Sequence, residues 1–285
     1  MPVHDDLGKR MKEFYEQVPK TRLVRRMPVA IRIDGKAFHS FTKGFERPFD
    51  DILIKSMQQT TQYLCENIQG CVLGYTQSDE ITLILVDYKN LESSAWFDYE
   101  VQKLCSISAS MATMAFNKVF QANCHAWFED NVDLDQLIAD PNSKTGKLFN
   151  AYEKAYKRGA MFDSRCFNIP KEEVTNLIYW RQLDATRNSI QMVGQANFSH
   201  KELHGKSCNM IQDMLITEKG INWNDFPTHK KRGSCVVHKG CADGRFHWVI
   251  DKEIPIFKGE GREYIEKLIR TSDCNCCSVQ SATIN

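Results

Sequence analysis

Residues 29–35 read Val-Ala-Ile-Arg-Ile-Asp-Gly, and residues 71–86 read Cys-Val-Leu-Gly-Tyr-Thr-Gln-Ser-Asp-Glu-Ile-Thr-Leu-Ile-Leu-Val. The first run is apolar and β-branched until Asp34-Gly35, so it predicts a strand that ends at a carboxylate. The second run predicts two strands, 71–75 and 81–86, joined by a turn over 77–80. Such a strand end beside a turn with Asp79-Glu80 brings carboxylates to one point of a sheet. We therefore predict a phosphoryl-transfer site, in which two divalent cations lie about 4 Å apart.

The same residues also allow an ordinary interpretation. Asp-Gly after a strand is a common turn, and Ser-Asp-Glu is a common exposed hairpin tip. Spacing alone does not separate this alternative from the metal site, so the decision depends on the rest of the chain.

The composition indicates a soluble globular protein of one large domain or two modest ones. The chain has 285 residues, of which 42% are apolar and 26% charged, and its net charge is +1. This total does not indicate a polyanionic partner, although a local basic patch remains open. No apolar run approaches the length of a membrane span, and residues 1–6 lack the features of a signal peptide. We expect a cytoplasmic protein without a membrane segment.

The eleven cysteines mostly sit singly within apolar runs, which is typical of buried thiols in a cytosolic enzyme. Cys235, His238, Cys241 and His247 loosely resemble a zinc site. However, residues 234–238 predict a strand with alternating side chains, so Cys235 and His238 would not converge. The polar tail that carries Cys274, Cys276 and Cys277 predicts an unstructured end, with no role assigned to these thiols.

The order of elements predicts the fold class. We expect a charged helix over 5–26, a helix that begins at Asp50 or Asp51 and ends at Gly70, a helix over 99–120 and a last strand over 161–169, with 121–159 partly irregular. This β-α-β-β-α-β order predicts an α+β, ferredoxin-like palm: an antiparallel sheet with helices on one face.

The second half of the chain predicts additional helices and a hairpin. Residues 171–198 predict one helix, and Ser199-His200-Lys201-Glu202 has the form of a capping box that begins another. Residues 235–237 and 246–250 predict two strands that pair across Asp243-Gly244.

Five motifs, taken together, resemble the tRNA-His guanylyltransferase family in order and spacing. They are Arg32-Ile33-Asp34-Gly35-x-x-Phe38-His39-x-Phe41, Gly74-Tyr75-x-Gln77-Ser78-Asp79-Glu80, Phe162-Asp163-Ser164-Arg165, Trp180-Arg181-Gln182-x-Asp184 and Arg232-Gly233. The resemblance covers about residues 5 to 240. It implies an enzyme that adds nucleotides to the 5′ end of tRNA, in the direction opposite to ordinary polymerases, on a palm-like domain.

The resemblance implies roles for individual residues at the catalytic end. Asp34 and Asp79 would hold two magnesium ions together with the carbonyl of Gly35, and Glu80 would support or join this site. The nucleotide-binding residues would be Gly35, Lys36, Ala37, Phe38, His39, Arg47, Ser78 and Lys103. Arg47 stands where the family commonly has a lysine. Lys103 falls where the family has a lysine that contacts the triphosphate of an activating nucleotide.

One departure from the family pattern points to a branch of it. Dedicated guanylyltransferases carry His-Ile-Asn-Asn after Trp-Arg-Gln-x-Asp, whereas this chain has Ala185-Thr186-Arg187-Asn188-Ser189. The run from Ser199 to Lys206 also fits the guanylyltransferase-like branch, which repairs 5′-truncated tRNA by template-dependent addition. Three alternatives stay open: dedicated G addition at position −1 of tRNA-His, a palm-fold nucleotide cyclase, and a non-catalytic tRNA-binding protein.

The resemblance also implies partners and organisation. ATP or GTP would activate the 5′ end, nucleoside triphosphates would be substrates, and the protein would be a homotetramer or dimer of dimers. Residues 1–170 would form the catalytic palm with the N-terminal helix, and residues 171–285 would pack on it and contribute to tRNA binding and oligomerisation. The tRNA contacts would be Arg181, Arg187, Asn188, Lys206, Lys231 and Arg232.

Overall fold

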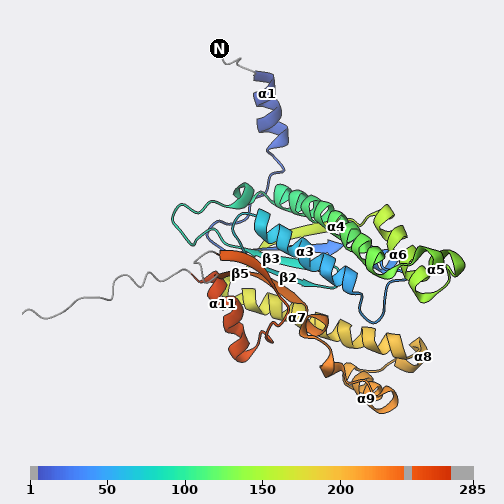
Figure 1. Ribbon diagram of the computed structural model, residues 1–285. Coiled ribbons are helices and arrows are strands. Elements are labelled where there is room, and N and C mark those ends of the chain that lie inside the picture. The colour runs from blue at the N-terminus through green and yellow to red at the C-terminus, as the bar shows by residue number, and fades with distance from the viewer. Residues whose placement is uncertain (1–5, 241–245, 271–285) are drawn as a thin grey trace, which may run out of the picture.

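A six-stranded antiparallel sheet lies at the centre of the computed structural model, which describes residues 6–240 and 246–270 (Figure 1). The strand order is β4-β1-β3-β2-β5-β6. The strands are β1 (Val29–Gly35), β2 (Cys71–Gln77), β3 (Glu80–Leu85), β4 (Phe162–Asn168), β5 (Ser234–Gly240) and β6 (Phe246–Asp251). The α+β palm prediction is confirmed.

Helices α3 (Asp51–Asn67) and α4 (Val101–Asn131) cover one face of the sheet (Figure 1). The Asp50 carboxylate accepts a hydrogen bond from the backbone N–H of Leu53, at 2.9 Å, and so caps α3 as predicted. Close packing of α3 on β2 requires Gly74, since a Cβ there would come within 2.5 Å of the Cys65 sulfur. The two palm helices therefore fix the sheet from one side.

Helix α7 (Lys171–Asn197) covers the opposite face together with α11 (Glu263–Ile269). Strand β1 contributes side chains to the hydrophobic cores on both faces of the sheet. Ile31 and Ile33 pack under α3 and α4, whereas Ala30 packs on the α7 side. Every residue of β3 is buried, as expected for a central strand with helices on both sides. The one long helix predicted over 171–198 is confirmed.

The remaining elements are short, apart from the peripheral helices α6 and α9. They are α1 (Asp6–Met11), the π-helix η1 (Lys12–Glu16), α2 (Phe38–Phe41), η2 (Trp96–Tyr99), α5 (Leu134–Ala139), α6 (Lys144–Arg158), α8 (His200–Leu203), α9 (Cys208–Lys219), η3 (Trp223–Asp225), α10 (Thr228–Arg232) and η4 (Gly259–Arg262). The capping box that predicted α8 is present in full.

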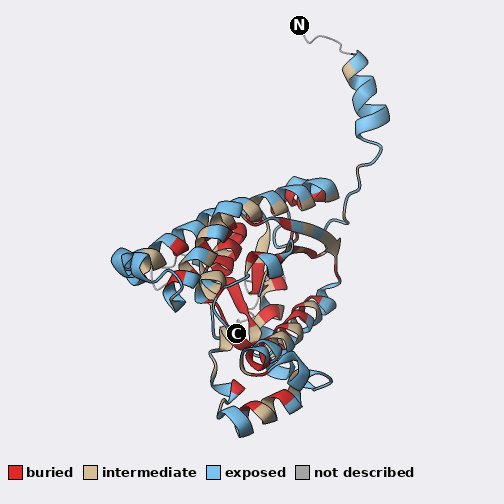
Figure 2. Cartoon of the chain, turned by 90° about the vertical axis from the view of Figure 1, so that its right-hand side faces the viewer, coloured by how far each residue is buried: buried red, intermediate tan, exposed pale blue. Residues whose placement is uncertain are grey.

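Two helix predictions were wrong in extent. The helix predicted over 5–26 ends at Glu16, because it projects from the body with its large apolar side chains exposed and meets Pro19 (Figure 2). The segment 121–159, predicted as partly irregular, is largely helical. Helix α4 continues through it to Asn131, because Cys124 remains buried beyond the predicted end and α4 packs on α6.

The C-terminal hairpin belongs to the same sheet as the palm strands. Strand β5 pairs with β2, with Tyr75 opposite Cys235, and β6 pairs with β5 as predicted. The proposed division at residue 170 remains a prediction, but strands from both sides of it share one sheet. In the described part of the chain, no helix has the length and apolar character needed to cross a membrane.

The structure describes only some of the cysteines about which the sequence made predictions. Cys235 is buried in the core on the α7 side, whereas the ring of His238 contacts Trp248, which packs against the other core. These two side chains therefore diverge, as the strand pattern predicts. Cys241, the Asp243-Gly244 turn, Cys274, Cys276 and Cys277 lie outside the described residues.

Candidate active site

The end of β1 lies against the turn of the β2–β3 hairpin. In the register of the sheet, Asp34 is opposite Glu80 on β3 and opposite Asp163 on β4. The backbone N–H of Gly35 donates to the carbonyl oxygen of Asp79 at 3.1 Å, which ties the strand end to the turn. Sheet pairing therefore brings the neighbourhoods of Asp34 and Asp79 together.

The turn itself consists of Ser78 and Asp79, between strands that end at Gln77 and begin at Glu80. Ser78 has φ of 50°, in the left-handed region, and its hydroxyl donates to Asp79 Oδ1 at 2.9 Å. Burial raises the pKa of the Asp79 carboxyl, and the charge of Asp34 raises that pKa further, while the Ser78 hydroxyl opposes both. Among the described residues, neither Asp34 nor Asp79 has a lysine, arginine or histidine nitrogen within ion-pair distance.

Glu80 differs from its two neighbours because it is already paired. Its carboxylate lies 2.7 Å from Nε of Arg181 on α7, in ion-pair contact without good hydrogen-bond angles, and 3.9 Å from Nε of Arg32. Burial raises the pKa of Glu80, and the two arginines oppose this rise. Glu80 thus pairs with Arg181 of α7, and its role in supporting or joining the metal site stays a prediction.

A cavity of about 650 Å³ opens beside the turn. Seven of the predicted site residues line it: Gly35, Ala37, Phe38, His39, Arg47, Ser78 and Asp79. Gly35 is required there by packing, since a Cβ would lie 2.2 Å from the Phe38 ring. The structure therefore gathers one carboxylate of the predicted pair and most of the predicted nucleotide contacts around one space.

The cavity also has walls that sequence reasoning missed. Met192 and Gln195 come from the last turns of α7, and Asp50 lines the cavity while it caps α3. Lys43 follows α2 and adds a positive charge to the wall. Asp50 carried a local signal as a helix cap, and Lys43 lies in the loop rich in aromatic and basic residues that follows β1. The two α7 residues reach the cavity through tertiary packing alone.

Two predicted nucleotide contacts do not line this cavity. Lys36 has an exposed side chain, and its backbone N–H donates to the carbonyl of Met161 at 2.8 Å. Lys103 is 54% exposed in its side chain and pairs with Glu100 at 3.8 Å. It lies in the first turn of α4, about 15 Å along the helix from Thr113, which contacts the β4 end nearest Gly35.

The six predicted tRNA contacts fall into two groups. Arg181 and Lys231 are buried: the first is paired with Glu80, and the second donates to the carbonyl of Asn224. We therefore correct both to residues of internal packing. Arg187 and Lys206 are exposed, and Asn188 and Arg232 are half-buried.

The model of the tRNA(His) guanylyltransferase family matches residues 8–170, more than half of the chain. The chain belongs to this family. Its members are tRNA guanylyltransferases, so the protein is a nucleotidyltransferase. The recognition made from the five motifs is confirmed.

Solved structures of the guanylyltransferase family share the fold. A bacterial tRNA(His) guanylyltransferase-like protein in complex with ATP is 40% identical, with a TM-score of 0.75, and the match covers 93% of this chain and 99% of that one. The complex of such a protein with GTP is 36% identical, with a TM-score of 0.69 and the same coverage. The tRNA(His) guanylyltransferase of Saccharomyces cerevisiae is 25% identical, with a TM-score of 0.59, over 79% of this chain and 92% of that one.

Proposed function

We propose that this guanylyltransferase-family protein repairs the 5′ end of truncated tRNA by template-dependent 3′-5′ addition of nucleotides. The observation that carries the proposal is a contrast between solved relatives. Identity is 40% to the bacterial guanylyltransferase-like protein but 25% to the yeast tRNA(His) enzyme, with TM-scores of 0.75 and 0.59. The segment Ala185–Ser189, which replaces His-Ile-Asn-Asn, agrees with this contrast. Dedicated addition of G at position −1 is the second candidate.

Asp34, Asp79 and the carbonyl of Gly35 would hold two Mg²⁺ ions. Within the described ranges, no three histidine, cysteine, aspartate or glutamate side chains form a metal-binding group. Mg²⁺ is nevertheless commonly held by one or two carboxylates, substrate phosphates and water, and the two carboxylates here supply hard oxygen donors without a cation of their own. When bound, the ions would stabilise the charge that develops on the attacking and leaving oxygens.

The cavity would hold the incoming nucleoside triphosphate. Its volume of about 650 Å³ lies within the range of small-molecule sites, and His39, Lys43 and Arg47 line it. The backbone from Gly35 to His39 and the Ser78 hydroxyl would contact phosphate oxygens. The relatives solved with ATP and with GTP support nucleotide binding by this fold. Lys103 would serve the activating nucleotide, apart from this cavity.

The reaction requires an activated 5′ end, because a bare phosphate monoester is a poor electrophile. ATP or GTP would supply the activating group. In that activation the 5′ phosphate would attack the α-phosphorus of ATP or GTP, and pyrophosphate would leave. The 3′-hydroxyl of the bound nucleotide would then attack the tRNA 5′ phosphorus, a new P–O bond would form, and the hydroxyl proton would pass to water. The leaving group would be the nucleoside monophosphate, or pyrophosphate where the tRNA already carries a 5′-triphosphate. The protein's part is to position the two reactants beside Asp34 and Asp79.

Transfer RNA would bind through exposed groups outside the core, with Arg187, Asn188, Lys206 and Arg232 as contacts. Because the net charge is only +1, such binding depends on a local patch and weakens with salt. A homotetrameric assembly and a cytoplasmic location complete the proposal.

The deciding experiment offers a tRNA that lacks its first nucleotide, with each nucleoside triphosphate in turn. We expect the added base to follow the opposite strand, including when that template base is mutated. A full-length tRNA-His that lacks only its −1 G is the control substrate. Addition of G whatever the template would favour the dedicated enzyme, and a cyclic product from GTP alone would favour a cyclase.

A further inference from the structure

A second cavity, of about 570 Å³, adjoins the first one. The two share Arg47 and Gln195 as wall residues. The second cavity is formed where the end of α7 meets α8 and the loop before α9. Its other lining residues are Gln191, Phe198, His200, Leu203, His204, Gly205, Lys206 and Ile211.

The lining of this second cavity suits an anionic, partly aromatic ligand. It carries Arg47, Lys206 and two histidines, and none of the described acidic residues lines it. Glu202, the carboxylate of α8, is instead held by the backbone N–H of Ser199 at 2.7 Å, within the capping box. Phe198 and Ile211 are buried and give the cavity an apolar floor. A ribonucleotide with its phosphate has this combination of charge and flat apolar surface.

The position of the second cavity matters as much as its chemistry. The two cavities meet at Arg47 and Gln195, and Gln195 lies one helical turn beyond Met192, which borders the first cavity together with Ser78. The Asp79 turn lines only the first cavity. A nucleotide held beside Asp79 in the first cavity would therefore have the second cavity as its neighbour.

We propose that the second cavity binds the templating nucleotide of the opposite RNA strand, with Lys206, His200 and His204 against its phosphate and sugar. This inference rests on the proposed repair function, because only a templated reaction needs a pairing partner beside the incoming base. The same cavity chemistry would also accept a free nucleotide. The experiment therefore separates an RNA strand from a free nucleoside triphosphate.

Lys206→Ala and His204→Ala are compared with Lys201→Ala, an exposed lysine of α8 that lines neither cavity. On a tRNA that lacks its first nucleotide, we expect Lys206→Ala to raise KM for the tRNA about tenfold, the effect of one lost charge-assisted contact. KM for the nucleoside triphosphate should stay unchanged, and the ratio of matched to mismatched addition should fall. Lys206→Arg should restore the KM for tRNA and the ratio of matched to mismatched addition. Lys201→Ala should resemble the wild type.

A binding measurement makes the test independent of turnover. A 4-thiouridine at the templating position of the truncated tRNA should crosslink to residues 198–206 on irradiation, and one placed ten nucleotides away should not. A raised KM for the nucleoside triphosphate with intact fidelity would assign the cavity to a free nucleotide and overturn the proposal. Unchanged kinetics with crosslinks elsewhere would also overturn it. Wild-type addition that ignores the template would instead refute the repair function itself, before any variant is made.

Discussion

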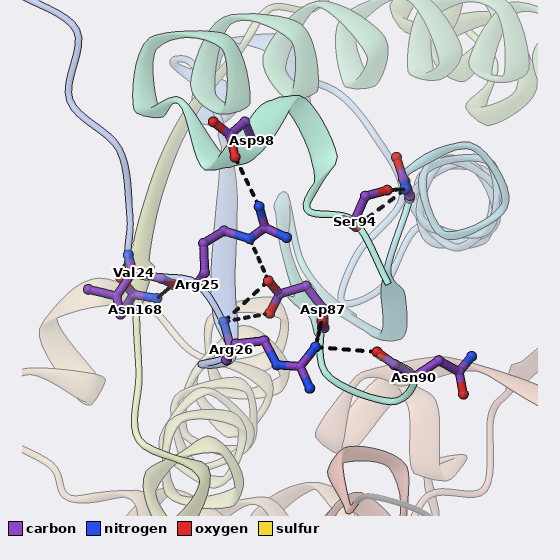
Figure 3. A network of polar contacts seen from close by, with 9 residues as sticks. Val24, Arg25, Arg26, Asp87, Asn90, Ser94, Asp98 and Asn168 are labelled. Atoms are coloured by element: carbon purple, nitrogen blue, oxygen red, sulfur yellow. Dashed lines mark hydrogen bonds and ion pairs between the residues drawn. The ribbon is translucent and has the colours of Figure 1, made fainter. Parts of the chain in front are cut away.

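Strand β3 has a carboxylate beyond each of its ends, and the two are treated differently. Asp87, after the strand, accepts from Nε of Arg25 at 2.7 Å and from the backbone N–H of Arg26 at 2.9 Å, and its side chain is fully buried (Figure 3). Asp79, before the strand, accepts from the Ser78 hydroxyl and, among the described residues, has no cation in ion-pair contact. The same strand thus presents one neutralised carboxylate and one that is not.

The difference separates a structural carboxylate from a functional candidate. A charge removed from water needs a partner, and Asp87 finds it in Arg25, as Glu80 finds it in Arg181. Asp79 stands beside Asp34, a like charge, at the edge of a cavity. Two neighbouring carboxylates without a protein cation attract a cation from solution. The proposed Mg²⁺ site requires such a pair.

The largest expected effect comes from Asp79→Asn, which keeps the shape of the side chain and removes its charge. We expect the rate of 5′ addition to fall by about 10³-fold or more, because a proposed ligand of the Mg²⁺ ions is lost. The melting temperature should stay the same or rise, since a like charge beside Asp34 is removed. Single-turnover addition and thermal melting measure the two quantities. Activity within tenfold of the wild type would remove Asp79 from the site.

The matched change at the other end, Asp87→Asn, should have the opposite result. Removal of the buried charge leaves the arginine contacts weakened and costs about 2 kcal/mol of unfolding free energy, reduced from the value of a fully buried pair because Arg25 is 44% exposed. Addition per folded molecule should stay within about twofold, since Asp87 does not line the cavity and lies beyond the opposite end of β3 from Asp79. Urea unfolding and activity below the transition test this. A large loss of activity at full stability would mean that Asp87 is not merely structural.

The sequence predicted the strands and the turn at this end of the sheet well, because their signals are local. The β-branched runs and the tight Ser78-Asp79 turn define β1, β2 and β3, and the palm order of elements then sets Asp34 beside the hairpin. The helix cap at Asp50 and the capping box before α8 are likewise local, since each involves residues within four positions of one another.

The sequence failed where a residue's partner is distant along the chain. Arg181 has the appearance of a helix surface charge, yet its partner Glu80 lies about a hundred residues earlier and buries it. Lys231 is also buried, although its partners, the carbonyl of Asn224 and the ring of Trp223, lie only seven and eight residues before it. No periodicity shows that Met192 and Gln195 reach the cavity, because only the packing of α7 on the sheet decides it.

Two arginines of α7, one buried and one exposed, provide a second test of the distinction between structural and functional charges. Arg181→Ala should cost about 3 kcal/mol of unfolding free energy, because Glu80 is then left buried with only Arg32, at 3.9 Å, as a partner. Arg187→Ala should leave stability nearly unchanged, since that side chain is 61% exposed. Its effect should appear in tRNA affinity, where the slope of log K against log salt becomes shallower by about 1. The opposite assignment of the two effects would restore Arg181 as the RNA contact.

The smallest expected effect is the response of stability to Mg²⁺, and it tests the comparison without any turnover. A ligand that binds only the folded state at ten times its Kd adds about 1.4 kcal/mol, which corresponds to about 3 °C in Tm for a chain of this size. We expect this rise for the wild type and for Asp87→Asn, and its loss in Asp34→Asn and Asp79→Asn. An equal rise in all four proteins would place the bound Mg²⁺ away from the β1 end. Because Asp87→Asn removes a carboxylate of the same kind from the same strand, it shows whether the response belongs to the unneutralised pair or to negative charge in general.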